Sequence, residues 1–376
     1  MAPCLGGGVT SAKAFFRPTW AEIRLASIKK NILRIRKIIG LRPRIMLVVK
    51  ANAYGHGAVE TARYVQKERL CGCLGVSSVE EGVGLRKSGV GLPILILGSL
   101  YPFESFAEAV NHDLSVTVSS LDAAKLVVAA SSKHKKKALC HIKLETGMGR
   151  IGARKPSVIK IFEELSGSKN AGIEGIYTHL SSADCDREFT MSQIRLFNET
   201  LELLPQRQTR HMLKHVANTY AAAHYPESRM DMVRTGIGAY GLVRGFEPAL
   251  SLKTRIVFLK DVRQGASIGY NRTFKAPKPM KIATIPIGYA DGYLRRFSNS
   301  ADMLVQGIRC RALGITMDMT MIDVSRIERP GVGDEVVVIG RQAGSEITAV
   351  ELSKIADTIP YETVSIITAR VPRIYL

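Results

Sequence analysis

The sequence predicts an α/β protein with an N-terminal (β/α)8 barrel of the TIM type over residues 19–244 and a mainly β domain over residues 245–376. Over the first two-thirds of the chain, short apolar runs alternate with amphipathic segments, which is typical of parallel βαβ units. After about residue 245 the runs become shorter and β-branched, with Gly and Pro between them. Residues 1–18 lack a continuous apolar run, so we expect a loose terminal segment without a secretory signal.

Eight strands are predicted in the barrel, and each is a short apolar run with a polar residue at its end. In chain order they are RIMLVVK ending at Lys50, CGCLGVS at Ser77, PILILGS at Ser99, LSVTVSS at Ser120, ALCHIKLE at Glu145, IEGIYTH at His179, MLKHVAN at Asn218 and MVRTGI at Ile237. Segments 78–88 and 191–204 are examples of the helices expected between them. An open doubly wound sheet is the alternative, because a count of strands does not show closure.

Polar side chains at the strand ends indicate where chemistry takes place. Lys50, Arg150, His179, Asn218 and Arg234 all lie at or just beyond a predicted strand end. In a barrel these ends meet at one mouth, where the active sites of such folds are found. A lysine at this position is either a strand end that reaches solvent or an amine whose pKa is lowered so that it acts as a base or attacks a carbonyl group.

The composition favours a globular protein and excludes several other classes. The chain of 376 residues is 46% hydrophobic, which is enough for a full core, and no apolar run approaches the roughly 18 residues of a membrane span. The six cysteines show no spacing typical of zinc sites, so we expect no metal and a reducing cytoplasm. The net charge is +20, but the basic residues are scattered apart from KHKKK at 133–137, which argues against a nucleic-acid partner. A basic surface of this kind still attracts phosphate-bearing ligands.

Nine motifs in order resemble the alanine racemase family, a group of fold type III enzymes that use pyridoxal 5'-phosphate (PLP). They are VVKANAYGHG, KLETGMGRIG, IYTHLSSAD, HVANT, MVRTGIGAYGL, IGYNRTF, IPIGYADG, GITMDM and YETVSIITARVPR. The resemblance runs from about Trp20 to the C-terminus. It implies a PLP-dependent racemase that forms a head-to-tail homodimer with shared active sites.

Two bases are implied by the resemblance. Lys50 resembles the lysine that binds PLP covalently, and Tyr270 in IGYNRTF resembles a second catalytic base. Racemisation removes the α-proton from one face of the amino acid and returns a proton to the other face. Two bases placed on opposite faces of the cofactor plane can carry out both transfers without moving. A phenol needs a neighbour to act as a base, and His179 resembles the histidine that hydrogen-bonds the tyrosine.

The resemblance also implies a cofactor site. Barrels often bind phosphate in the loops after strands seven and eight, where this chain has HVANT and TGIG. Arg234 resembles the arginine that faces the pyridine nitrogen of PLP. Because a guanidinium keeps its proton at neutral pH, it donates a hydrogen bond to the ring nitrogen and leaves that nitrogen unprotonated. The family usually has serine at the position of Thr219, and either hydroxyl suffices. The residues matched to the phosphate are Tyr54, Asn218, Thr219, Gly236, Ile237 and Tyr361.

The substrate carboxylate has its own implied partners. Arg150 in GMGR resembles an arginine near the phenolic oxygen of the cofactor and the substrate carboxylate. Lys143 matches a lysine that is often carbamylated in the family and whose new carboxylate orients the arginine. Glu145 stands where we expect aspartate. The resemblance further assigns Tyr289 to the substrate entrance, and Met317 and Asp318 to the substrate side of the partner's site.

The resemblance implies a racemase that interconverts L-alanine and D-alanine and supplies D-alanine for peptidoglycan, and the cysteine usage adds the expectation of a cytoplasmic protein. A racemase of serine or of a broader range of amino acids is the alternative on the same scaffold. A fold type III decarboxylase is disfavoured by Arg234, and a non-enzymatic PLP-binding barrel would typically lack the second domain. A basic scaffold that binds nucleic acid is the remaining rival.

Overall fold

The computed structural model describes residues 16–376 and divides into two compact units. The first, called the barrel unit below, consists of Ile23–Leu250, Ile359–Ile366 and Tyr375–Leu376. The second, the β unit, consists of Ser251–Thr358, Ile367–Ile374 and the described residues up to Glu22. The predicted segment 1–18 therefore lies outside the described residues, apart from residues 16–18.

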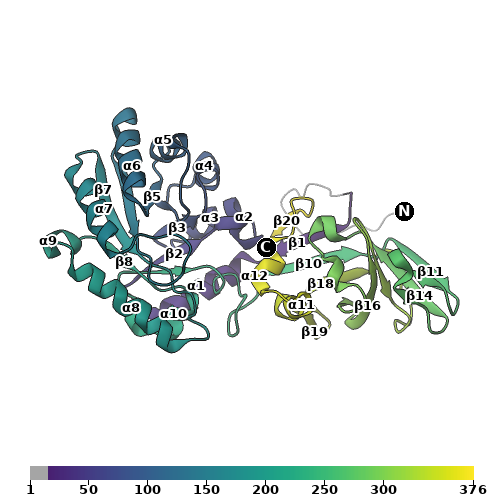
Figure 1. Ribbon diagram of the computed structural model, residues 1–376. Helices are drawn as coiled ribbons and strands as arrows, with labels where there is room; N and C mark the ends of the chain where they lie inside the picture. The colour runs from purple at the N-terminus through teal and green to yellow at the C-terminus, as the bar shows by residue number, and fades with distance from the viewer. Residues whose placement is uncertain (1–15) are drawn as a thin grey trace. The chain divides into compact units, whose positions relative to one another are not determined.

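Eight parallel strands form the sheet of the barrel unit, each at a run that the sequence predicts (Figure 1). They are β2 (Arg44–Val48), β3 (Cys73–Val76), β4 (Ile94–Ile96), β5 (Ser115–Val118), β6 (Ala138–Lys143), β7 (Ala171–Tyr177), β8 (Leu213–His215) and β9 (Met232–Thr235). The spatial order is β8-β7-β6-β5-β4-β3-β2-β9, so the strands follow one another around the sheet.

The edges of this sheet meet between β8 and β9. The backbone N–H of Asp231 donates to the carbonyl of Lys214 at 3.0 Å, and that of Arg234 donates to Ala217, also at 3.0 Å. A doubly wound sheet would reverse its strand order at a switch point, and this sheet does not. The predicted barrel is therefore confirmed, with strands β8 and β9 linked by these flanking bonds.

Helices alternate with the strands, as expected for parallel units. They are α1 (Leu25–Ile39), α2 (Lys50–Tyr54), α3 (Ala58–Lys67), α4 (Val79–Lys87), α5 (Phe103–Asn111), α6 (Leu121–His134), α7 (Lys155–Gly167), α8 (Arg187–Glu202), α9 (Gln206–Thr209), α10 (Thr219–His224) and α12 (Pro360–Ser365), with the 3-10 turn η1 (Pro226–Ser228) after α10. Side-chain caps fix several starts: the Ser78 hydroxyl accepts from the backbone of Glu81, and the Asp186 carboxylate from that of Phe189. Within residues 16–376, no helix combines the length and the apolar character that a bilayer crossing requires.

The β unit is built on an antiparallel sheet, which agrees with the predicted mainly β domain. Its strands are β1 (Thr19–Ile23), β10 (Leu250–Arg255), β11 (Phe258–Val262), β14 (Met280–Ile285), β15 (Asp302–Val305), β16 (Ile308–Ile315), β17 (Thr320–Asp323), β18 (Glu335–Gln342), β19 (Ser345–Ile347) and β20 (Arg373–Tyr375). A two-stranded sheet of β12 (Ser267–Ile268) and β13 (Phe274–Lys275) accompanies it, together with α11 (Ala349–Ala356) and the 3-10 turns η2 (Tyr270–Arg272), η3 (Tyr289–Asp291) and η4 (Arg295–Phe297).

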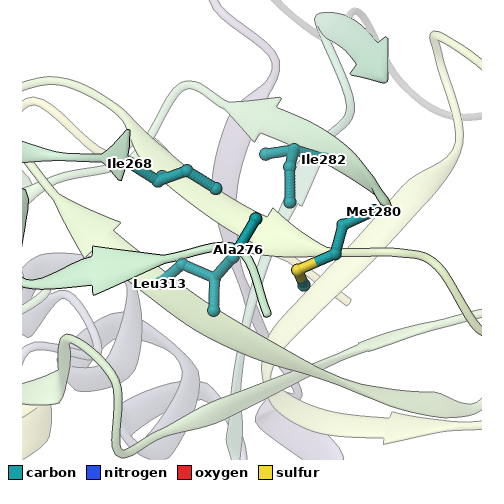
Figure 2. Packing of buried hydrophobic residues seen from close by; sticks show 5 residues of the cluster. All are labelled: Ile268, Ala276, Met280, Ile282 and Leu313. Carbon is teal, nitrogen blue, oxygen red and sulfur yellow. The ribbon is translucent and has the colours of Figure 1, made fainter. Parts of the chain in front are cut away.

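A cluster of apolar side chains joins these two sheets (Figure 2). Ile268 of β12 and Ala276 pack with Met280, Ile282 and Leu313 of β14 and β16, and all five are less than 8% exposed. Because β12 leads directly into η2, this packing places Tyr270 at the edge of a rigid core.

The first described strand does not belong to the barrel. Residues 19–22, which the sequence places at the start of the barrel, form β1 in the β unit between β10 and β20. Thr19 and Ala21 are buried there, and the Ala21 N–H donates to the carbonyl of Pro372 at 2.9 Å. A run of five residues does not indicate which strands it pairs with, and β10 and β20 begin more than 200 residues later in the sequence.

Candidate active site

Lys50 opens a turn with left-handed backbone geometry directly after β2. Ala51, Asn52 and Ala53 have φ between 50° and 55° and ψ between 46° and 51°. Such angles are unfavourable for residues with a Cβ, so neighbouring bonds must stabilise the turn. Glu81 contributes by accepting from the backbone of Ala51 at 2.7 Å and from that of Ser77 at 2.7 Å.

The amine of Lys50 is mostly buried and lies near both a cation and an anion. Burial lowers its pKa from the usual value, the nearby Arg150 lowers it further, and Glu81 opposes the change. Burial lowers the pKa of His179 well below 6.5, and the positive charges of Arg234, Arg150, Lys143 and Lys50 lower it further. The structure thus brings together five residues from four strand ends. This mouth favours a neutral lysine, a neutral histidine and an anionic ligand.

Lys143 is the most perturbed of these amines. It lies at the end of β6 and is 3% exposed. Burial first, and then the charges of Arg150 and Arg234, lower its pKa to about 7. Near neutral pH a large fraction of this amine is therefore uncharged.

Glu145, the predicted departure from aspartate, controls the loop that carries Arg150. Its carboxylate accepts from the backbone N–H of Gly147 at 2.6 Å. Burial works to raise its pKa, but backbone hydrogen bonds, with that of Gly147 first, lower it overall. The side chain thus anchors the Gly-rich turn before Arg150, which is itself exposed at the mouth.

Arg234 points its terminal nitrogens into the protein. It lies on β9 and is 4% exposed. Its NH1 donates to Nδ1 of His215 at 2.9 Å and to the carbonyl of His215 at 2.7 Å. Its NH2 donates to the carbonyls of Thr178 at 2.7 Å and Val216 at 3.1 Å. Burial lowers the pKa of this guanidinium to about 10, so it stays charged at neutral pH.

The backbone of Gly236 lies directly against the side chain of Tyr54. A Cβ added to Gly236 would lie 2.7 Å from the Tyr54 hydroxyl, so only glycine fits there. The ring of Tyr54 packs on Tyr240 with centroids 5.3 Å apart, and the Tyr240 hydroxyl donates to the carbonyl of Val48 at 2.9 Å. Tyr361 of α12 lies close enough to raise the pKa of Tyr54, which burial and this neighbour bring to about 12. Tyr54 therefore lies beside Gly236 and near Tyr361, which are three of the residues matched to the phosphate by sequence.

Asn218 and Thr219 lie at the start of α10. The Asn218 side chain caps this helix by accepting from the backbone of Ala221 at 2.9 Å. The Thr219 hydroxyl is 3.4 Å from that of Thr235 and accepts weakly from the backbone of Gly238 at 3.4 Å. Ile237, half-buried, follows Gly236 directly, so these loops after β8 and β9 are neighbours.

The remaining predicted residues belong to the β unit. The backbone N–H of Tyr289 donates to Thr316, and that of Ala290 donates to the carbonyl of Met317, both at 3.1 Å. Asp318 accepts from Arg370 at 2.7 Å. Tyr289 and Met317 are 40% and 52% exposed, so three predicted residues share one accessible corner.

Tyr270 is 65% exposed and lies near the strand that leads to this corner. A Cβ on the preceding Gly269 would lie 3.3 Å from the Cα of Gly314, in β16. The predicted site residues thus form two groups, one on each unit.

Sequence reasoning missed the polar side chains beneath the mouth. His141, Glu174 and His215 lie inside the barrel unit and form hydrogen bonds with one another. One available signal was spacing: His141 precedes Lys143 by two residues on β6, so both point to the same face. His215 likewise ends its strand.

Known proteins match this chain over both predicted domains. The family described as alanine racemase, N-terminal domain, matches residues 23–244, and the family described as alanine racemase, C-terminal domain, matches residues 249–375. Alanine racemase 2 of Caldanaerobacter subterraneus subsp. tengcongensis is 41% identical over 371 residues, covering 96% of this chain and 95% of that protein. Alanine racemase of Symbiobacterium thermophilum is 42% identical over 370 residues, covering 96% of this chain and 97% of that protein.

Solved structures agree with these sequence matches. An alanine racemase of Clostridium difficile 630 has a TM-score of 0.91 at 34% identity and covers 96% of this chain and 97% of its own. That of Bacillus anthracis, solved with bound L-Ala-P, has a TM-score of 0.90 at 34% identity and covers 96% of both chains. With matches that run through both domains and almost the whole chain, this protein belongs to the alanine racemase family and is an isomerase.

Proposed function

We propose that this chain interconverts L-alanine and D-alanine with bound PLP and two bases, Lys50 and Tyr270. The observation that carries the proposal is the mouth of the barrel, where a lysine with a lowered pKa lies among Lys143, Arg150 and Arg234 in a chain that matches alanine racemases. Those charges attract anions, as PLP and a substrate carboxylate both are.

The residues present fit PLP. Lys50 offers an amine with a lowered pKa for covalent attachment. The loops after β8 and β9, with Asn218, Thr219, Gly236 and Ile237, would hold its phosphate group, and Tyr54 and Tyr361 would offer their hydroxyls to it. When bound, PLP supplies an electron-withdrawing ring that makes the α-proton of an amino acid acidic.

Each base acts on one face of the substrate. Lys50 takes or returns the α-proton on its own side when its amine is neutral, which the lowered pKa promotes. The partner subunit's Tyr270 takes or returns the proton on the opposite side, with His179 as its hydrogen-bond partner. His179 stays neutral because its pKa is held well below 6.5, so it can exchange a proton with the phenol.

The other residues hold the substrate and tune the ring. Arg150 binds the substrate carboxylate, and a carbamylated Lys143 orients Arg150. A lysine with a pKa of about 7 is sufficiently neutral to take up CO2. Arg234 donates toward the pyridine nitrogen and keeps it unprotonated, since a guanidinium with a pKa of about 10 retains its own proton at neutral pH. Tyr289, Met317 and Asp318 line the entrance and the substrate side of the partner's site.

The experiment follows alanine enantiomers by chiral chromatography after incubation of the protein with PLP. We expect D-alanine from L-alanine, loss of this activity in Lys50→Ala, and retention of activity in the control Lys67→Ala, an exposed lysine of α3. Borohydride reduction should fix the cofactor onto Lys50 in peptide maps. Reduced cofactor on another lysine, or faster turnover of serine or lysine than of alanine, would overturn the assignment.

The proposed setting is a cytoplasmic homodimer whose product supplies peptidoglycan. This part of the proposal is supported by the family and by the distribution of the predicted site residues over two units, because Lys50 and Tyr270 do not lie on the same unit. Size measurement in solution tests the dimer directly. Growth of a D-alanine auxotroph carrying this chain tests the metabolic role.

A further inference from the structure

A chain of hydrogen bonds runs inside the barrel unit, away from the mouth. Arg234 NH1 donates to Nδ1 of His215 at 2.9 Å. The other ring nitrogen of His215, Nε2, lies 2.8 Å from Nδ1 of His141. Nε2 of His141 in turn lies 3.1 Å from Oε2 of Glu174. His215 and His141 are 0% and 2% exposed, so water does not substitute for these bonds.

The two ends of this chain fix its direction. A guanidinium only donates hydrogen bonds, and an ionised carboxylate only accepts them. His215 must therefore accept at Nδ1 and donate from Nε2, and His141 must do the same toward Glu174. The pKa of His215 lies well below 6.5 because of burial and then the charge of Arg234, and the bond from His141 lowers the pKa of Glu174. Both histidines thus carry the same hydrogen-bond order, accepting at Nδ1 and donating from Nε2, between a cation and an anion.

Neighbouring residues hold each ring in place. The ring of Tyr177 stacks on His215 with centroids 4.6 Å apart and planes 7° apart. The Tyr177 hydroxyl shares a hydrogen bond of 2.8 Å with Thr117. A Cβ on Gly175 would lie 2.4 Å from Nδ1 of His141, so the position of this histidine depends on glycine in the adjacent strand.

A β-bulge places Glu174. In the pairing of β6 with β7, Cys140 is opposite Ile173 and His141 is opposite Gly175, which leaves Glu174 as the extra residue. Bulges redirect a side chain that regular alternation would send to the other face. Ser115 of β5 donates to the same carboxylate oxygen at 2.8 Å.

The carboxylate end reaches a small cavity opposite the mouth. The cavity has a volume of about 30 Å³ and is lined at the amino ends of the strands by residues that include Arg44, Ser115, Glu174 and Leu213. The Glu174 side chain is 26% exposed, whereas that of His141 is 3% exposed. A space of this size holds about one water molecule, so the cavity gives the carboxylate some hydration but is too small for a substrate.

We propose that Glu174 is a positioning residue for Arg234, acting through His141 and His215. By fixing both tautomers it presents an acceptor to NH1 of Arg234, and NH2 is already engaged by two backbone carbonyls. Within the described residues, Nε is the one nitrogen of this guanidinium without an acceptor, and so it is the donor left for a ligand at the mouth. The ligand in question, PLP, rests on the proposed function, whereas the order of the tautomers does not.

Without the Glu174 carboxylate, the two histidines would no longer be held in one tautomer. His141 could then carry its proton on Nδ1 and donate to Nε2 of His215, which would move the proton of His215 to Nδ1. That proton would face the NH1 donor of Arg234 across 2.9 Å, and two donors repel. Arg234 would turn away, and the donor at the mouth would be misplaced.

The test compares Glu174→Leu with Ser115→Ala in the full-length protein. The serine variant removes a hydrogen bond to the same carboxylate but keeps the acceptor for His141. Nitrogen-15 spectra of histidine-labelled protein report the tautomers of His141 and His215, with assignment by single histidine variants. We expect the Nε2–H form at both residues in the parent and in Ser115→Ala, and mixed tautomers in Glu174→Leu.

Kinetics provide the second readout. We expect Glu174→Leu to lower kcat for alanine about 10- to 100-fold with KM changed less than about threefold, as for other residues that orient an active-site group from behind. Ser115→Ala should stay within about twofold of the parent. Glu174→Gln, which keeps an oxygen acceptor, should restore most of kcat and the parental tautomers.

Three results would overturn the proposal: unchanged tautomers in Glu174→Leu, changed tautomers with unchanged kcat, or an equal loss in Ser115→Ala. If the leucine variant does not fold, Glu174→Met takes its place, because its unbranched side chain fills a similar volume without offering an oxygen acceptor to His141. A parent protein without racemase activity would refute the proposed function, while the nitrogen-15 spectra would still decide whether Glu174 orders the histidines.

Discussion

At the scale of single residues, the site depends on amines that burial keeps partly neutral. Lys50 and Lys143 both have lowered pKa values, for which burial is the first cause and Arg150 the second. An ordinary surface lysine is almost fully protonated at neutral pH and cannot serve as a base or take up CO2. Cation crowding at the mouth therefore creates reactivity at the expense of folded-state stability.

That cost predicts a pH dependence of stability. Lys143 has a pKa of about 7 in the folded chain and the usual value, near ~10.4, when unfolded. Between these values the unfolded chain binds more protons at this residue, so its contribution to stability rises with pH, and below pH ~7 the full penalty remains. Lys143→Met should therefore stabilise the apoprotein more at pH 6 than at pH 9.

Urea unfolding in CO2-free buffer measures this difference, because carbamylation would exchange the buried cation for an anion. Lys67→Met, on the exposed side of α3, serves as the control and should change stability little at either pH. An equal gain from Lys143→Met at both pH values would mean that the amine is not destabilised by its surroundings.

At the scale of elements, the turn after β2 is left-handed, whereas the ordinary α-helices of the barrel unit are right-handed. Left-handed geometry costs a residue with a Cβ roughly 1–2 kcal/mol, whereas glycine adopts it freely. Ala51 is exposed and has φ of 50°, so its side chain adds strain without burying surface. The strain persists because Glu81 and the surrounding packing fix the backbone.

We predict that Ala51→Gly is neutral or stabilises the chain by up to about 1 kcal/mol. The matched control is Ala129→Gly at an exposed position inside α6, where right-handed geometry makes glycine cost about 1 kcal/mol. Thermal or urea unfolding of the two variants gives the comparison. A loss from Ala51→Gly as large as that from Ala129→Gly would exclude a left-handed turn at this point.

The sequence was sufficient to predict the strands of the barrel but not the left-handed turn after β2. The eight apolar runs of the barrel stand out because both faces of such strands are buried, and each run coincides with an observed strand. Nothing in the residues that follow Lys50 predicts a left-handed turn, since only Asn52 tolerates such angles well. The position of Glu174 was not predicted for a similar reason. The direction of its side chain depends on a β-bulge, and the pattern of apolar residues does not reveal a bulge.

At the scale of the whole molecule, the proposed site requires two chains, and this can be tested by mixing variants. Lys50→Ala and Tyr270→Phe homodimers should each be nearly inactive, because every site lacks one base. When the two are unfolded and refolded together, about half the dimers are mixed, and each mixed dimer holds one intact site. Activity should recover to roughly a quarter of that of the parent.

Tagged subunits verify that exchange has taken place. If Tyr270 served Lys50 of its own chain, every site in the mixture would still lack one base. Exchange without recovery would therefore refute the shared site, even if each variant had lost activity as expected.

The position of β1 has a consequence for how the protein is made. This strand leaves the ribosome first among the described elements, yet its neighbours β10 and β20 begin at residues 250 and 373. All eight barrel strands are translated while β1 still lacks both partners. The mouth of the barrel is also incomplete until late in translation, because α12, which carries Tyr361, begins only at Pro360. A nascent chain thus completes its proposed phosphate site and its first strand in the same late step, so a truncated product would present an unpaired strand for aggregation or chaperone capture instead of a partly active enzyme.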